Sequence, residues 1–84
     1  LAVSFGGDQP TLVIRNKDIP GQVQQVTTFL AEENINIAAM QLYRSKRGED
    51  AVMVIECDKE IPDDVIGALE GLSGIVRVTY LSLK

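Results

Sequence analysis

Residues 11–30, TLVIRNKDIPGQVQQVTTFL, change from the pattern of a strand to that of a helix across a single turn. Residues 11–15 are a β-branched, apolar run, which is typical of a strand. Pro20 and Gly21 then mark a sharp change of direction. Beyond them, small and apolar side chains recur at the spacing of one helix face: Val23, Val26, Thr27 and Leu30. The stretch predicts a strand, a turn and a helix, in that order.

The second half of the chain repeats this stretch. The pattern Ile19–Pro20–x–x–Val23 recurs as Ile61–Pro62–x–x–Val65, and Leu30 corresponds to Leu72 at the same offset. The repeat predicts a second helix that Pro62 opens and that Gly71 or Gly74 ends. Its apolar stripe is expected to contain Val65, Ile66, Leu69 and Leu72.

Three more segments have strand character. Residues 36–44 (NIAAMQLYR) alternate, with Met40 on one face and Ile37 on the other, and residues 51–57 (AVMVIEC) return after a polar turn. Residues 75–83 form the last strand. The resulting β-α-β-β-α-β order predicts an α+β, ferredoxin-like fold: two interleaved βαβ halves, one four-stranded antiparallel sheet, and both helices on one face.

That architecture leaves the second face of the sheet uncovered. Strands that are apolar on both faces are expected to be covered, because a contiguous exposed apolar patch usually marks an interface. We therefore expect a homodimer formed through the sheet, or packing against the remainder of a longer polypeptide. Residues 1–5 (LAVSF) predict a short extra strand. Residues 1–9 are interpreted as the end of a preceding segment, and residues 10–84 as the domain itself.

The composition excludes several function classes. The chain has 84 residues, 45% of them hydrophobic and 24% charged, which is typical of one small globular domain. It has no His and one Cys, so it lacks Ser-His-Asp and Cys-His sites, an internal disulfide and a Cys₄ metal site. A net charge of −4 disfavours nucleic-acid binding, and no apolar run suits a membrane span. We expect a cytoplasmic, non-catalytic module with no cofactor or metal of its own; a small autonomous enzyme is disfavoured.

The turn at residues 16–21 is the candidate functional site. Gly21 lies where a helix begins, so unpaired N–H groups and the positive end of the helix dipole can hold a carboxylate. Asp18 can accept an ammonium group, and Asn16 and Asn36 can bond to a polar ligand side chain. These groups together describe an α-amino-acid site. The alternative is that Pro20 and Gly21 serve only the turn.

From residue 10 to residue 83 the sequence resembles the ACT domain, a small amino-acid-sensing module attached to metabolic enzymes. The resemblance rests on the D-x-P-G-x-V turn at residues 18–23, on AEENINIA at residues 31–38 and on the AVMVIECD strand. It implies a ligand held between two domains. Asn16, Asp18, Gly21 and Val23 would come from one copy, and Asn36 and Ile37 from the other. In serine-binding relatives the position of Asp18 is often Asn, so this chain departs from their hydrogen-bond pattern.

Within the family, the chain looks most like the regulatory domain of the iron–sulfur L-serine dehydratase β chain, to which its lead-in VSFGGDQPTL is similar. The regulatory domain of D-3-phosphoglycerate dehydrogenase is the next most similar. The resemblance implies L-serine or another small amino acid as the ligand. It also implies a parent enzyme that converts L-serine to pyruvate and ammonia, with a 4Fe–4S cluster in its catalytic part. A purely structural dimerisation domain is the other possibility.

The remaining chemically active side chains have simpler interpretations. Cys57 lies in an apolar strand, where a free thiol behaves as a small hydrophobic group. The basic group of Arg44, Lys46 and Arg47 is interpreted as a solvated hairpin tip. The adjacent acidic pairs at residues 49–50 and 63–64 are interpreted as solvated or dipole-stabilised charges.

Overall fold

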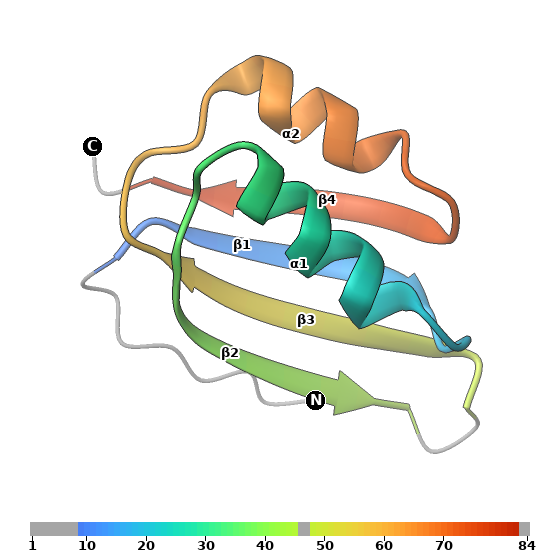
Figure 1. The fold of residues 1–84 in the computed structure, drawn as a ribbon. Helices are drawn as coiled ribbons and strands as arrows, with labels where there is room; N and C mark the ends of the chain where they lie inside the picture. The colour runs from blue at the N-terminus through green and yellow to red at the C-terminus, as the bar shows by residue number, and fades with distance from the viewer. Residues whose placement is uncertain (1–8, 46–47, 83–84) are drawn as a thin grey trace.

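The chain forms six elements in the predicted order. A computed structural model describes residues 9–45 and 48–82. It contains β1 (Thr11–Lys17), α1 (Gln22–Glu32), β2 (Ile37–Arg44), β3 (Asp50–Cys57), α2 (Asp63–Glu70) and β4 (Ile75–Leu81), as Figure 1 shows. The β-α-β-β-α-β prediction is confirmed. The extra strand predicted at residues 1–5 lies outside the described residues.

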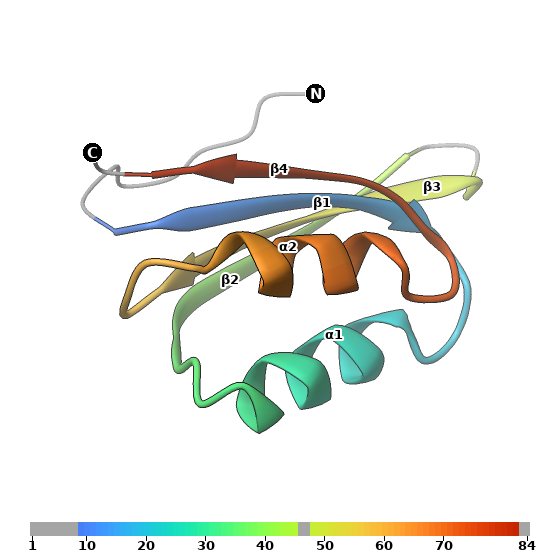
Figure 2. The same ribbon diagram turned by 90° about the horizontal axis from the view of Figure 1, so that it is seen from above.

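The four strands form one antiparallel sheet in the order β2-β3-β1-β4. β1 and β3 are therefore the central strands, and β2 and β4 are the edges. Both helices lie on the same side of the sheet, which is plain in the view from above (Figure 2). This is the ferredoxin-like arrangement that the element order predicts.

The hydrophobic core lies between the sheet and the two helices. Each central strand sends alternate side chains into it, such as Leu12 and Ile14 from β1 and Met53 and Ile55 from β3. The helices contribute a stripe of buried side chains: Val26, Leu30, Val65 and Leu69. Truncating a fully buried core residue of this size to alanine typically costs about 2–5 kcal/mol.

β2 departs from the strict alternation that its sequence predicts. A register shift lies between Ile37 and Ala39, so that Ile37 faces Cys57 while Met40 faces Ile55. Because Cys57 and Ile55 are both core residues, Ile37 and Met40 pack on the same face, against the core. The prediction that they lie on opposite faces was wrong, because a bulge adds one residue to β2 without adding one to β3.

The two sequence repeats are not equivalent in burial. Ile61 and Val65 are 4% and 6% exposed, whereas Ile19 and Val23 are 49% and 36% exposed. The prediction that Val23 belongs to the buried stripe of α1 was therefore wrong; Gln22 is buried in that turn instead. The chain enters the helices along different paths, since the residue before α1 is Gly21 in the left-handed region and the residue before α2 is an extended Pro62.

The turn between α2 and β4 is tied to the start of α1. The Gln22 Nε2 donates to the Ser73 carbonyl oxygen over 3.1 Å, and the Gln25 Nε2 donates to the same oxygen over 2.9 Å. The next residue, Gly74, has a φ of +81°. A Cβ atom at Gly74 would lie 2.6 Å from the Gln22 Nε2 atom. The backbone conformation therefore favours glycine at this position, and an added Cβ would also displace the Gln22 amide from Ser73.

We predict opposite effects for two glycine-to-alanine substitutions. Gly74→Ala should lower the free energy of unfolding by more than about 1 kcal/mol, because alanine strains the left-handed backbone and meets Gln22. Gly67→Ala, within α2 where an added Cβ meets nothing within 4 Å, should raise it by about 0.5–1 kcal/mol. Urea unfolding of both variants measures the difference, and shifts of the same sign would contradict the prediction.

Candidate functional site

A pocket of about 220 Å³ lies where β1 and β2 end and α1 begins. It brings together four of the predicted site residues, Asn16, Asp18, Gly21 and Val23, one after the other along the turn. Leu42 and Arg44 of β2 complete its wall. These predicted site residues thus lie around one concave surface, and their role in ligand binding stays a prediction.

Asn16 supplies a buried polar atom that faces no partner. Its side chain is on the helix-covered face of β1 and is only 2% exposed. The Asn16 Nδ2 donates to the Lys17 carbonyl oxygen over 2.9 Å, but among the described residues nothing bonds to the Oδ1 atom. A buried acceptor left without a donor costs about 1–3 kcal/mol. In a residue that lines a pocket, such an atom indicates a place for a donor from outside the chain.

Gly21 places the start of α1 at the same pocket. Its φ of +88° is in the left-handed region, and no side chain caps the N–H groups of the first turn of α1. A Cβ atom at Gly21 would meet nothing within 4 Å, so the backbone conformation and not a lack of space favours glycine here. Uncapped N–H groups at the positive end of the helix dipole can bind a carboxylate.

Asp18 is held in place by two contacts. Its N–H donates to the Glu49 carbonyl oxygen over 3.2 Å, and its Oδ1 lies 3.3 Å from the Arg44 Nε. The carboxylate that the sequence assigns to a ligand ammonium therefore already has a cationic neighbour. The interpretation of Arg44 as part of a solvated hairpin tip missed this contact. The register of the β2–β3 hairpin is the signal that indicates it, because Arg44 faces Ala51 and Ala51 faces Asn16.

Asn36 and Ile37 lie at the other end of the molecule from the pocket. Ile37 faces Cys57, whereas Arg44 faces Ala51. The interval from Ala51 to Cys57 is about 20 Å along an extended strand. The Asn36 N–H donates to the Asp58 Oδ1 over 3.2 Å. One chain therefore brings together four of the six predicted residues and leaves the other two distant.

Apolar side chains surround the pocket. Ile19, Val23 and Leu42 are among the few large hydrophobic residues of the described part of the chain that are exposed, and all three line the pocket. Three neighbouring apolar side chains in water are typical of a surface that another molecule covers.

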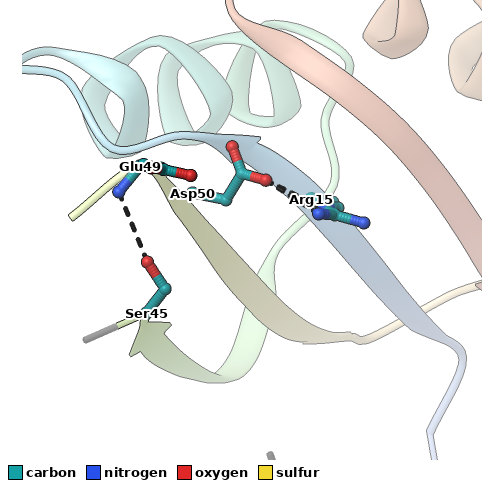
Figure 3. A network of polar contacts seen from close by, with 4 residues as sticks. All are labelled: Arg15, Ser45, Glu49 and Asp50. Atoms are coloured by element: carbon teal, nitrogen blue, oxygen red, sulfur yellow. Dashed lines mark hydrogen bonds and ion pairs between the residues drawn. The ribbon is translucent and has the colours of Figure 1, made fainter. Parts of the chain in front are cut away.

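A second hollow, of about 510 Å³, is lined by Arg15, Tyr43, Arg44, Asp50 and Val52. The Arg15 Nε and Nη2 donate to the same Asp50 oxygen over 3.1 and 2.8 Å. Figure 3 shows this ion pair beside the hydrogen bond from the Glu49 N–H to the Ser45 Oγ. The Arg15 side chain is mostly exposed, so its pair with Asp50 is worth no more than about 1 kcal/mol.

Cys57 packs in the core, as its sequence context predicts. The thiol is fully buried, and burial, followed by the negative charge of Asp58, raises its pKa from 9.0 to about 11. A buried thiol with so high a pKa stays protonated near neutral pH, so it is a poor nucleophile there. Over residues 9–45 and 48–82, no three acidic, Cys or His side chains cluster as a metal site would require. No helix in that part of the chain is long and apolar enough to cross a bilayer.

Comparisons with known proteins give one family model and several relatives. A family model described as the ACT domain matches residues 10–74. The chain is 32% identical over 81 residues to D-3-phosphoglycerate dehydrogenase of Methanocaldococcus jannaschii, covering 96% of this chain and 16% of that protein. It is also 32% identical over 78 residues to a probable L-serine dehydratase β chain of Bacillus subtilis, covering 93% of this chain and 36% of that one.

The fold likeness extends to solved structures. The ACT domain from the GTP pyrophosphokinase of Chlorobium tepidum superposes with a TM-score of 0.68 at 20% identity, covering 86% of this chain and 95% of that one. The chain thus matches a whole small domain in that structure, whereas it spans well under two thirds of the two curated relatives.

We predict that Cys57 makes stability depend on alkaline pH. The folded state keeps the thiol proton up to about pH 11, whereas the unfolded thiol loses it near 9.0. The stabilisation is complete below pH 9 and is lost as pH rises toward 11, up to about 3 kcal/mol in all. Urea unfolding at pH 8, 9 and 10 should show this fall in the natural chain and a smaller one in Cys57→Ala. Tyr80, whose pKa burial also raises, is present in both proteins. Parallel pH profiles would contradict the assignment.

Proposed function

The chain belongs to the ACT domain family, and from this membership and the geometry of the pocket we propose that it binds a small amino acid and regulates an attached metabolic enzyme. L-serine is the proposed ligand. The probable L-serine dehydratase β chain among its relatives supports that choice, because its name includes this amino acid.

The observation that carries the proposal is the unpaired Asn16 Oδ1 at the pocket. An α-amino acid brings a carboxylate, which the uncapped N–H groups after Gly21 can bind, and an ammonium group, which suits Asp18. Serine adds a hydroxyl, and its O–H can donate to the Asn16 Oδ1. One small molecule can thus meet Asn16, Asp18 and the first N–H groups of α1 together.

Asn36 and Ile37 enter the same site if two copies pair through β2. This strand is at the edge of the sheet, and Arg44 is its only charged residue, so it lacks the charges that commonly block edge pairing. Antiparallel pairing of β2 with β2 of a second copy sets the start of one strand against the end of the other. Asn36 and Ile37 of the second copy would then lie beside Arg44 and the pocket, and the exposed apolar side chains around it would be covered.

We propose an L-serine dehydratase, which converts L-serine to pyruvate and ammonia, as the parent enzyme, with D-3-phosphoglycerate dehydrogenase as the alternative. The 4Fe–4S cluster expected in such a dehydratase does not fit this chain, because its one cysteine is buried and protonated. We propose that such a cluster would be held by the catalytic part of the parent enzyme.

A purely structural dimerisation domain is the second candidate function. The apolar rim of Ile19, Val23 and Leu42 favours it, because burial of that rim would stabilise a dimer with or without a ligand.

We predict that L-serine binds with a dissociation constant between about 1 μM and 1 mM, which suits a metabolite sensor. Asp18→Ala and Asn36→Ala should each weaken binding at least about tenfold, because each removes a charged or polar partner of the ligand. Isothermal titration calorimetry measures both. Asp64→Ala, an exposed acid in the first turn of α2, is the matched control and should bind as the unaltered chain does.

Mixing the two variants tests whether the site is shared between copies. In a mixed dimer, one site keeps Asp18 from the Asn36→Ala chain and Asn36 from the Asp18→Ala chain, so one intact site should reappear in each mixed dimer. No recovery would show that both residues act within one chain or that Asn36 is not part of the site. Dimers that bind no amino acid would support the structural alternative.

A further inference from the structure

Arg44 is the one basic side chain among the described residues that line the turn pocket, and Asp18 is the one acidic side chain there. The two form an ion pair, with the Arg44 Nε 3.3 Å from the Asp18 Oδ1. The formal charges around the pocket therefore cancel. A lone aspartate would attract any small cation, whereas in this pair the charge of Arg44 opposes part of the attraction of Asp18 for a simple amine.

The ion pair has unused bonding capacity on both sides. A guanidinium carries five N–H donors, which is more than one carboxylate oxygen accepts, and its Nε lies 3.3 Å from the Asp18 Oδ1. The Arg44 side chain is 67% exposed and the Asp18 side chain 19%, so the arginine can turn toward a ligand while the carboxylate stays largely in place. Asp18 has a second carboxylate oxygen, which can accept an N–H from a ligand.

A zwitterion fits this arrangement better than either of its charged halves. Its ammonium group can bind Asp18, and its carboxylate can direct one oxygen to the N–H groups after Gly21 and the other to Arg44. Charge-assisted hydrogen bonds of this kind are the strong ones. A ligand without a carboxylate leaves Arg44 close to its ammonium group. A ligand without an ammonium group places its carboxylate close to Asp18.

We infer that Arg44 is a specificity-determining residue, which makes the pocket select zwitterionic amino acids over amines and over carboxylic acids of the same size. This inference rests on the proposed amino-acid site and adds a residue and a rule of selection to it.

The chain offers a matched control for Arg44. Arg15 of β1 forms a comparable exposed ion pair with Asp50 of β3. Arg15 lines the second hollow and not the turn pocket. Arg15→Gln removes the same charge and the same kind of ion pair, so any general effect of losing one arginine appears in both variants.

The test compares L-serine with two ligands, each of which lacks one of the two charged groups of serine. L-serine carries both charges, ethanolamine is serine without the carboxylate, and 3-hydroxypropionate is serine without the ammonium group. Titration calorimetry of the unaltered chain should show serine binding at least about tenfold more tightly than either. In Arg44→Gln, the affinity for serine should fall by about tenfold or more. The affinity for ethanolamine should rise, because Asp18 loses its competing cation. Arg44→Lys keeps the charge and should retain the preference for serine over ethanolamine.

The outcomes distinguish a failure of the role of Arg44 from a failure of the proposed amino-acid site. Arg15→Gln should give the affinities of the unaltered chain, and urea unfolding with sedimentation velocity checks that all variants fold and associate alike. The role of Arg44 would be overturned if serine binding is unchanged in Arg44→Gln, or if the affinities for serine and ethanolamine fall by the same factor. Either result would leave the amino-acid site intact. Absence of serine binding in the unaltered chain would overturn the proposed function itself, and the inference with it.

Discussion

The antiparallel pairing of β1 with β3 is the constraint on which the rest of the structure depends. Its register sets Leu12 opposite Ile55 and Ile14 opposite Met53, so that both central strands turn their apolar side chains toward the helices. A slip of one residue would turn these side chains to the other face, and the core would be lost. The same alternation, carried two residues further, brings Asn16 to the helix side and to the edge of the pocket. Core packing and site geometry thus follow from one register.

At the end of the sheet where β1 stops, the fold leaves polar groups without partners and apolar side chains exposed. The left-handed Gly21 turns the chain into α1 with no capping side chain, Asn16 keeps a buried oxygen without a donor, and the first repeat leaves Ile19 and Val23 in water. The second repeat buries its corresponding apolar residues, Ile61 and Val65. The same local sequence pattern has therefore been used once for packing and once for a surface that a ligand and a second copy would complete. This asymmetry is the physical basis for assigning the regulatory role to the first turn.

Much of the fold could be predicted from local pattern, and the misses have specific causes. The order of the strands and helices is confirmed. Val23 is on α1 but is exposed, because the chain enters this helix from a left-handed Gly21 and buries Gln22 in the first turn instead. The face of Ile37 was predicted wrongly because strict alternation does not anticipate a bulge in β2. Of the site, the sequence indicated Asn16, Asp18 and Gly21, but not the pairing of Asp18 with Arg44.

The sequence by itself determined what each segment prefers locally: where strands and helices form, which side chains avoid water, and where the turn lies. These preferences follow from backbone sterics and from periods of 2 and 3.6 residues, which a linear pattern carries. The tertiary structure alone decided which distant residues meet. Arg44 reaches Asp18 because the register of β2 on β3 and of β3 on β1 brings them together. It also separated Asn36 from the turn, because β2 runs its full length between Asn36 and the pocket. No local period encodes such a meeting, since it depends on the register of two strand pairs at once.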